Sequence, residues 1–121
     1  MTTTESEVAA FLASDVVRGI DYVAPEDVRT ALTRFLACAR EELDKGFSEL
    51  TGLELEELLR RRLPGRYVPD EPLARRTIDV LRLYLAFREP ELEAEHGRDL
   101  RSALEAGAEP FRDAVRDGGR T

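Results

Sequence analysis

The stretch PEDVRTALTRFLACAREELDKGF, residues 25–47, is the most regular amphipathic pattern in this 121-residue chain and decides its fold class. Pro25 suits the first position of a helix, and Glu26 and Asp27 favour the positive end of the helix dipole. Apolar residues then recur every three or four positions, with charged residues on the opposite face. The pattern predicts a helix of about twenty residues, some 30 Å long.

A second helix is expected before this stretch. Thr4 and Glu7 form a capping-box pattern, and the apolar residues behind them share one helical face. The pattern predicts a helix over residues 5–18, which Gly19 can close.

A third helix is expected after it. Leucines at three- and four-residue spacing predict a helix over 55–63, stopped by Pro64-Gly65. Residues 66–70 are then expected to form an extended connector, because two positions in this region precede prolines. The connector should end in a cap supplied by Asp70 or Glu71.

The remaining sequence predicts a helix over 72–88 and weaker elements beyond it. Apolar residues surround most of the 72–88 helix, which predicts burial on several sides or a face for self-association. A looser helix passes through Gly97, and Gly107 and Pro110 are expected to introduce a separate short helix. Residues 118–121 are expected to form a flexible tail.

These patterns predict an all-α fold, with a single domain over residues 1–117. We expect a bundle of four main helices plus one or two short C-terminal helices, with the helices over 25–47 and 72–88 at its centre. The predicted core consists of Phe11, Leu12, Val28, Leu32, Phe35, Leu36, Leu43, Leu58, Leu59, Ile78, Leu81, Tyr84 and Leu85.

The cellular setting is constrained by what the sequence contains. The one cysteine, Cys38, has no second cysteine with which to pair, and residues 1–7 lack the basic and apolar regions of a signal peptide. The most apolar run, residues 80–87, is much shorter than the roughly 20 residues of a membrane span. We therefore expect a cytoplasmic protein that does not insert into membranes.

A basic segment stands out from an acidic chain. Seven arginines and three carboxylates lie between Arg60 and Arg82, a net charge of +4. The rest of the chain carries −11, which gives the total of −7. Such contrast favours an interaction module, of the adaptor, regulator, antitoxin or immunity type, that binds an acidic protein surface or a second copy of itself as a homo-oligomer. The predicted contact residues are Arg60, Arg61, Arg62, Arg66, Arg75 and Arg76.

Nucleic acid is an alternative partner for the same arginines. Each phosphate that they neutralise would release counterions and make binding sensitive to salt. The charge of −11 elsewhere would repel a polyanion, and Tyr67 is the one aromatic residue of the segment. The sequence therefore favours a protein partner over nucleic acid.

A metal site is the second alternative. Glu93 and His96 have the Glu-x-x-His spacing that places both side chains on one helical face, and Glu89 lies one turn earlier. Bundles that bind two metal ions use two such pairs, so a homodimer would have to supply the second. No cofactor other than such a metal ion is expected.

Enzymatic chemistry is disfavoured by the residue inventory. The chain has one histidine and one cysteine, on different predicted helices, and lacks the glycine-rich loops that bind phosphate. The paired carboxylates have the pattern of solvated helix faces. We therefore expect a non-enzymatic binding protein.

Overall fold

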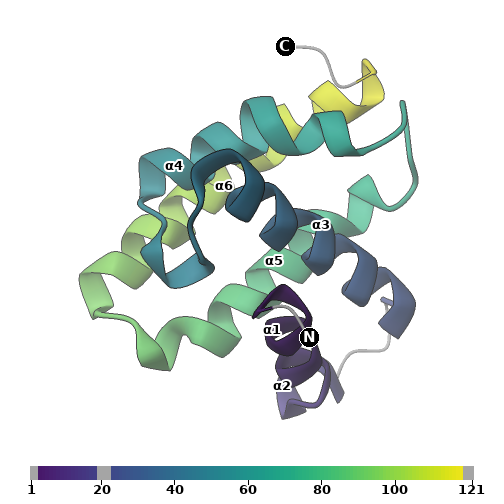
Figure 1. Cartoon of the computed structure of the whole chain (residues 1–121). Helices are drawn as coiled ribbons and strands as arrows, with labels where there is room; N and C mark the ends of the chain where they lie inside the picture. The colour runs from purple at the N-terminus through teal and green to yellow at the C-terminus, as the bar shows by residue number, and fades with distance from the viewer. Residues whose placement is uncertain (1–2, 19–22, 119–121) are drawn as a thin grey trace.

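The structure is a computed structural model that describes residues 3–18 and 23–118. These residues form helices and connecting turns, with no strand, which confirms the predicted all-α class (Figure 1). In chain order the elements are α1 (Thr3–Leu12), α2 (Asp15–Arg18), α3 (Pro25–Leu43), η1 (Phe47–Glu49), α4 (Gly52–Glu57), η2 (Leu58–Arg62), η3 (Leu63–Arg66), α5 (Ala74–Arg88), η4 (Glu89–Glu91) and α6 (Ala94–Arg116). Of these, η1, η3 and η4 are 3-10 turns, and η2 is π-helical.

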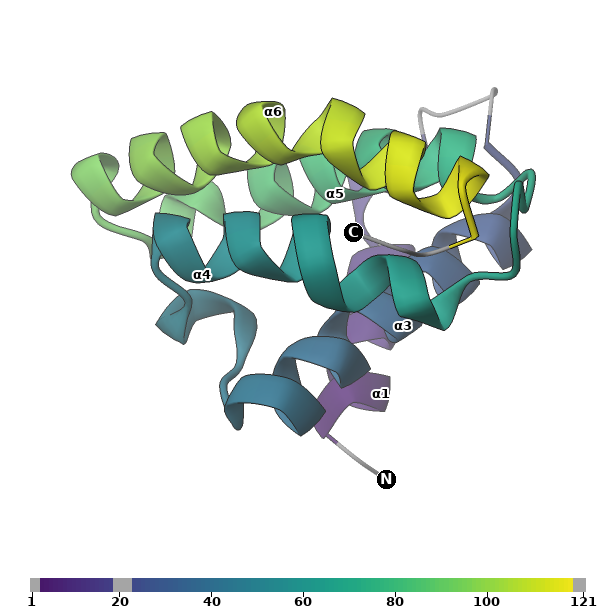
Figure 2. The same cartoon turned by 90° about the horizontal axis from the view of Figure 1, so that it is seen from above.

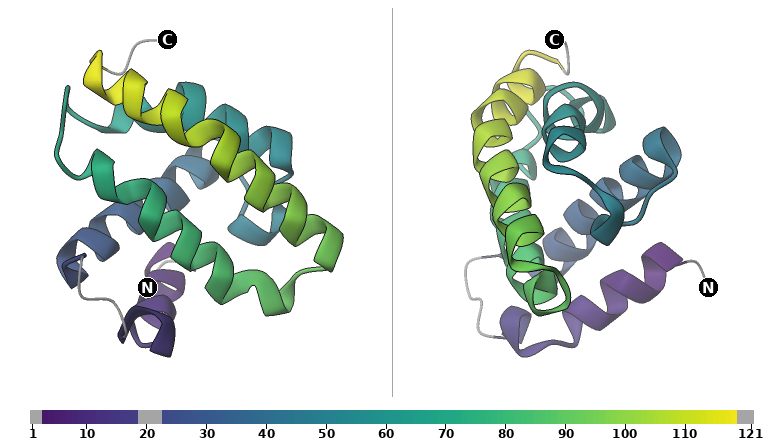
Figure 3. Two further views of the ribbon diagram at one scale, coloured as in Figure 1. Left: turned by 180° about the vertical axis from the view of Figure 1, so that it is seen from behind. Right: turned by 90° about the vertical axis from the view of Figure 1, so that its left-hand side faces the viewer.

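The longest helix, α6, organises the C-terminal half. It packs against α5 on one side and against α4, η2 and η3 on the other (Figure 2). Helices α5 and α6 form an antiparallel pair joined by η4 (Figure 3). Helix α3 packs against both α1 and α5, so it connects the N-terminal helices to this pair.

The core agrees closely with the sequence prediction. Leu12 and Leu43 are partly buried against it, and the other predicted core residues are buried. What the prediction left out is the contribution of α6. Its buried apolar side chains are Leu100, Ala103, Leu104, Ala108, Phe111, Ala114 and Val115.

The predicted helix over 5–18 is interrupted after α1. Ser14 donates a hydrogen bond from its hydroxyl to the carbonyl oxygen of Phe11, at 2.6 Å. A serine that bonds locally to the backbone competes with the helical hydrogen bonds, so α1 ends and α2 starts at Asp15. Gly19, which was expected to close this helix, lies outside the described residues.

Helix α3 begins at Pro25 as predicted but ends at Leu43, before Phe47. Asp44 adopts the left-handed conformation, with φ 55°, and its N–H donates to the carbonyl of Arg40. This closes the helix in the way that an αL cap does. Phe47 remains buried, but in η1.

The third predicted helix is longer than expected at both ends. Thr51 forms a capping box with Glu54, which starts α4 at Gly52. Pro64 does not end the helical segment, because it occupies an early position of η3, where its missing N–H is not needed. Helical backbone therefore continues from Gly52 through Arg66.

Helix α5 is buried on several sides, as predicted, and starts at Ala74. The predicted cap is wrong: no side chain caps this helix, and the Glu71 carboxylate instead accepts from the backbone N–H of Val68. The apolar residues of α5 are covered by α2, α3 and α6 of the same chain. Packing within the chain therefore accounts for the many apolar residues of α5, and no face for self-association is needed to explain them.

The predicted short C-terminal helix is also wrong, because Pro110 lies inside the continuous helix α6. Gly107 is required there by packing, since a Cβ atom would lie 2.8 Å from Cδ1 of Leu59. Burial of Phe111 and Val115 on the same face outweighs the hydrogen bond that proline cannot make. Of the predicted flexible tail, residues 119–121 lie outside the described residues.

Candidate functional site

The first part of the predicted arginine contact lies on a π-helical turn. In η2 the backbone N–H of Leu63 donates to the carbonyl of Leu58, five residues earlier. Turns of this kind are rare and occur frequently at functional sites. Leu58 and Leu59 face the core, while Arg60, Arg61 and Arg62 are exposed.

Two of these arginines form ion pairs within their own helical segment. Arg60 Nε lies 2.8 Å from a carboxylate oxygen of Glu56, and Arg61 Nε lies 3.4 Å from one of Glu57. Both pairs join residues four positions apart on an exposed face. Such pairs are worth about 0.3–0.5 kcal/mol, so either guanidinium can exchange partners readily.

The next two arginines connect η2 and η3 to α3. Arg62 lies 3.4 Å from Glu42, and Arg66 contacts Glu41 at 2.8 Å and Glu42 at 3.5 Å. The side chain of Arg66 is only 28% exposed. These guanidiniums are committed to contacts within the chain.

Arg75 and Arg76 differ from the other four. They lie in the first turn of α5, they are exposed, and neither forms an ion pair with any described residue. The structure thus divides the six predicted residues into two locally paired, two bonded across helices and two unpaired. It does not bring all six onto one site.

Two further arginines, which sequence analysis missed, lie beside Arg75. Arg112 and Arg116 are in the last turns of α6, where that helix reaches the start of α5. A hollow of about 230 Å³, here called the arginine hollow, lies between the start of α5 and the end of α6. It is lined by Asp70, Ala74, Arg75, Arg112, Val115 and Arg116.

The sequence did contain a signal for this arrangement. Arg112 and Arg116 are four residues apart, so they share a face of any continuous helix. The predicted short helix after Pro110 contained that face. The predicted interruption at Gly107 and Pro110 concealed the antiparallel pairing of α6 with α5, which places the face beside Arg75.

The three predicted metal ligands do not converge on one site. Glu89 pairs with Arg101, and Glu93 is exposed at the N-cap of α6. His96 Nε2 lies 2.7 Å from the carbonyl oxygen of Leu50; because a carbonyl only accepts, Nε2 carries the proton. Among the described residues, no group of three or more His, Cys, Asp or Glu side chains is placed to hold a metal ion.

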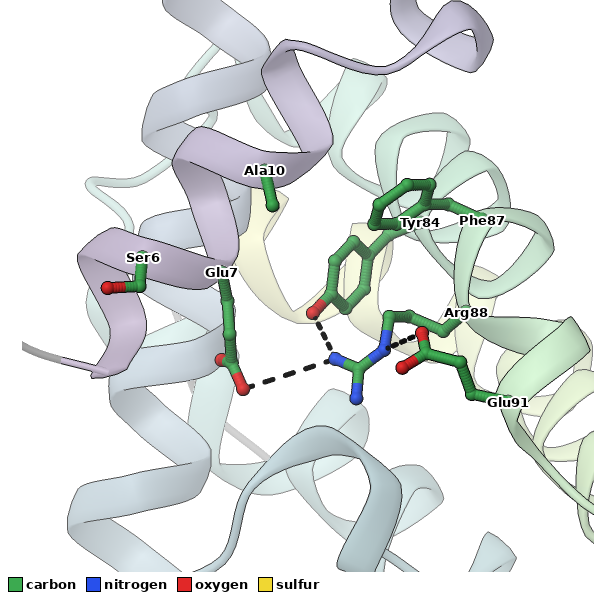
Figure 4. Close-up of a pocket in the computed structure, with 7 residues that line it drawn as sticks. All are labelled: Ser6, Glu7, Ala10, Tyr84, Phe87, Arg88 and Glu91. Carbon is green, nitrogen blue, oxygen red and sulfur yellow. Dashed lines mark hydrogen bonds and ion pairs between the residues drawn. The ribbon is translucent and has the colours of Figure 1, made fainter.

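A separate pocket of about 320 Å³ lies between α1 and the end of α5 (Figure 4). The guanidinium of Arg88, whose side chain is 14% exposed, occupies its centre. It donates to the Tyr84 hydroxyl at 2.6 Å and to Glu91 at 2.9 Å, and Glu7 lies 4.0 Å away. The rings of Phe47 and Tyr84 lie within 6 Å of its central carbon.

This second pocket has the character of a structural joint. Burial acts to lower the pKa of Arg88, but Tyr84 and Glu91 outweigh it, so the pKa is raised and the group stays charged. Glu7 and Glu91 flank the guanidinium, so the pocket already contains its counter-charges. Arg88 therefore connects the end of α5 to α1 and η4 through its ion pairs with Glu7 and Glu91.

No family model, curated protein or solved structure matches this chain. Within the described residues, no helix has both the length and the apolar character needed to cross a membrane.

Proposed function

We propose that the chain is a protein-binding module that recognises an acidic surface of a partner protein. The contact is made by the arginine surface, defined as Arg75, Arg76, Arg112 and Arg116. The observation that carries this proposal is that Arg75, Arg76 and Arg112 form no ion pair with any described residue. This occurs in a chain that has 25 acidic and 18 basic side chains.

Unpaired arginines are well suited to such a contact. A guanidinium offers five N–H donors, and its hydrogen bonds to carboxylates are roughly twice as strong as those between neutral groups. Arg75 and Arg76 need break no ion pair with a described residue before they bind a partner. In contrast, Arg62 and Arg66 would first have to release Glu41 and Glu42.

The overall charge supports a protein rather than a nucleic acid as the partner. A chain with a net charge of −7 repels a long polyanion, whereas a small acidic patch needs to approach only the arginine surface. A second copy of the chain is one acidic protein that meets this description, and native mass spectrometry measures self-association directly. We propose a cytoplasmic setting, in which the buried thiol of Cys38 stays reduced.

A titration with a short polyglutamate peptide at low salt tests this function. Amide and guanidinium NMR signals should shift at the ends of α5 and α6, and added salt should reverse the shifts. The double variant Arg75→Gln/Arg76→Gln should weaken binding. Arg98→Gln is the matched control, because Arg98 is an exposed residue of α6 that forms no ion pair with a described residue.

Two results would contradict the proposal. The first is a titration that shifts residues of η2 and leaves the ends of α5 and α6 unchanged. The second is tighter binding of a single-stranded oligonucleotide that carries the same charge as the peptide. The second result would support the nucleic-acid alternative.

A further inference from the structure

Contacts between the connector before α5 and the end of α6 hold the arginine hollow in place. The backbone N–H of Asp70 donates to the carbonyl oxygen of Val115 at 2.9 Å, which joins the connector before α5 to the end of α6. Ala74 and Val115, both nearly inaccessible, line the hollow from the two helices. The guanidinium-bearing residues are therefore held by packed helix ends.

The charges around the hollow leave two guanidiniums available. Arg116 is 3.0 Å from Asp113, so much of its charge is matched within the last turn of α6. Arg75 and Arg112 have no ion pair with any described residue. Asp70 also lines the hollow and opposes the entry of a strongly charged anion.

We propose that the arginine hollow receives the carboxylate of a single glutamate side chain of the partner, between Arg75 and Arg112. This inference rests on the proposed function and names the group recognised. The two oxygens of the glutamate carboxylate can accept from the guanidiniums of Arg75 and Arg112, which both line the hollow. A group with one negative charge suits the site better than a phosphate dianion, because Asp70, Asp113 and Asp117 all lie close by.

The test uses the full chain and a short, end-blocked peptide in which one glutamate lies among glycines and serines. Binding is measured by NMR titration, alongside peptides that replace the glutamate with glutamine or phosphoserine. The glutamate peptide should shift the guanidinium signals of Arg75 and Arg112. Arg75→Gln and Arg112→Gln should each weaken binding about tenfold, as expected for the loss of a charged hydrogen bond.

Two control variants separate this inference from the proposed function. Arg76→Gln removes a charge from the arginine surface but not from the lining of the hollow. It should therefore weaken binding of the glutamate peptide much less than Arg112→Gln does. Arg98→Gln should have no effect. All these residues are solvent-accessible, so the variants should remain folded, and circular dichroism checks this.

Each outcome decides something. If Arg75→Gln and Arg76→Gln weaken polyglutamate binding and Arg112→Gln does not, the function stands and the hollow is not the site. If no arginine variant changes binding, both ideas fail. Binding of the phosphoserine peptide with none of the glutamate peptide would overturn the choice of a carboxylate, and equal binding of the glutamine peptide would exclude charge recognition.

Discussion

Leu59 of η2 and Gly107 of α6 lie in such close contact that a Cβ atom on residue 107 would be 2.8 Å from Cδ1 and 2.9 Å from Cβ of Leu59. The Cβ of Leu59 is attached to the backbone, so rotation of its side chain cannot relieve both contacts. The π-helical turn and the longest helix can therefore approach each other only where α6 has no side chain. This contact joins η2, which carries Arg60, Arg61 and Arg62, to α6.

Gly107→Ala should lower the free energy of unfolding by about 1–3 kcal/mol, because it overpacks this interface. Chemical denaturation followed by circular dichroism measures the change. Gly97→Ala is the matched control in the same helix, since its Cβ would lie 3.5 Å from the Glu89 side chain, an ordinary contact. That variant should be neutral or stabilising by up to about 1 kcal/mol, because alanine is the better helix former. Equal destabilisation by both substitutions would contradict the packing argument.

Arg66→Gln should lower stability by up to about 1 kcal/mol, because it removes the ion pairs that connect η3 to Glu41 and Glu42 of α3. Arg75→Gln should change stability by less than about 0.5 kcal/mol, since Arg75 has no ion pair with any described residue. Thermal unfolding of the two variants tests this difference. A larger loss of stability in Arg75→Gln than in Arg66→Gln would contradict the assignment of Arg66 to a structural contact and of Arg75 to the arginine surface.

Arg88→Met should lower the free energy of unfolding by about 1.5–3 kcal/mol, the range for hydrogen bonds to charged groups. The substitution keeps a long apolar side chain beside Phe47 but leaves the Tyr84 hydroxyl and Glu91 without their shared donor (Figure 4). Denaturation measures the loss, and limited proteolysis should detect earlier release of α1. An unchanged melting temperature would show that this joint contributes little.

Acidification should destabilise the protein through Glu105. The hydrogen bonds from Arg82 hold the pKa of Glu105 below its ordinary value of 4.5. A group whose pKa is lower in the folded state contributes stability above its unfolded pKa and loses it as the pH falls through the folded pKa. Stability should therefore decline below about pH 4.5, and Glu105→Gln should reduce the part of the decline that depends on this pair. A pH profile identical to that of the parent chain would contradict this role.

Cys38 should react slowly with thiol reagents in the folded protein. Burial raises the pKa of its thiol from 9.0 to about 11, so little of the reactive thiolate is present near neutral pH. Labelling should become fast in denaturant. Rapid labelling of the folded chain would show that the helix around Cys38 opens readily.

The sequence was most informative where a local pattern coincides with burial. Val28, Leu32 and Phe35 repeat with helical spacing, and they are all buried in α3. It was least informative where tertiary packing overrides local preference. Pro110 predicted an interruption that the burial of Phe111 prevents.

The candidate site was only half predictable for the same reason. Arg75 and Arg76 could be identified because they belong to a basic stretch of sequence. Arg112 and Arg116 could not, because their place beside Arg75 depends on the antiparallel pairing of α5 with α6. Likewise, Arg62 and Arg66 form ion pairs with Glu42 and Glu41 of α3, which local sequence patterns around the arginines do not reveal.

The arginine surface is a discontinuous epitope, because its arginines come from α5 and α6. The hydrogen bond from Asp70 to Val115 holds these two segments together. A peptide that spans residues 60–76 carries the six arginines that the sequence predicted as contact residues, but none from α6. It would therefore be a poor substitute for the intact chain in a search for binding partners. An antibody raised against that peptide should likewise fail to compete for this surface at the α6 end, whereas one raised against the folded protein can cover both helix ends at once.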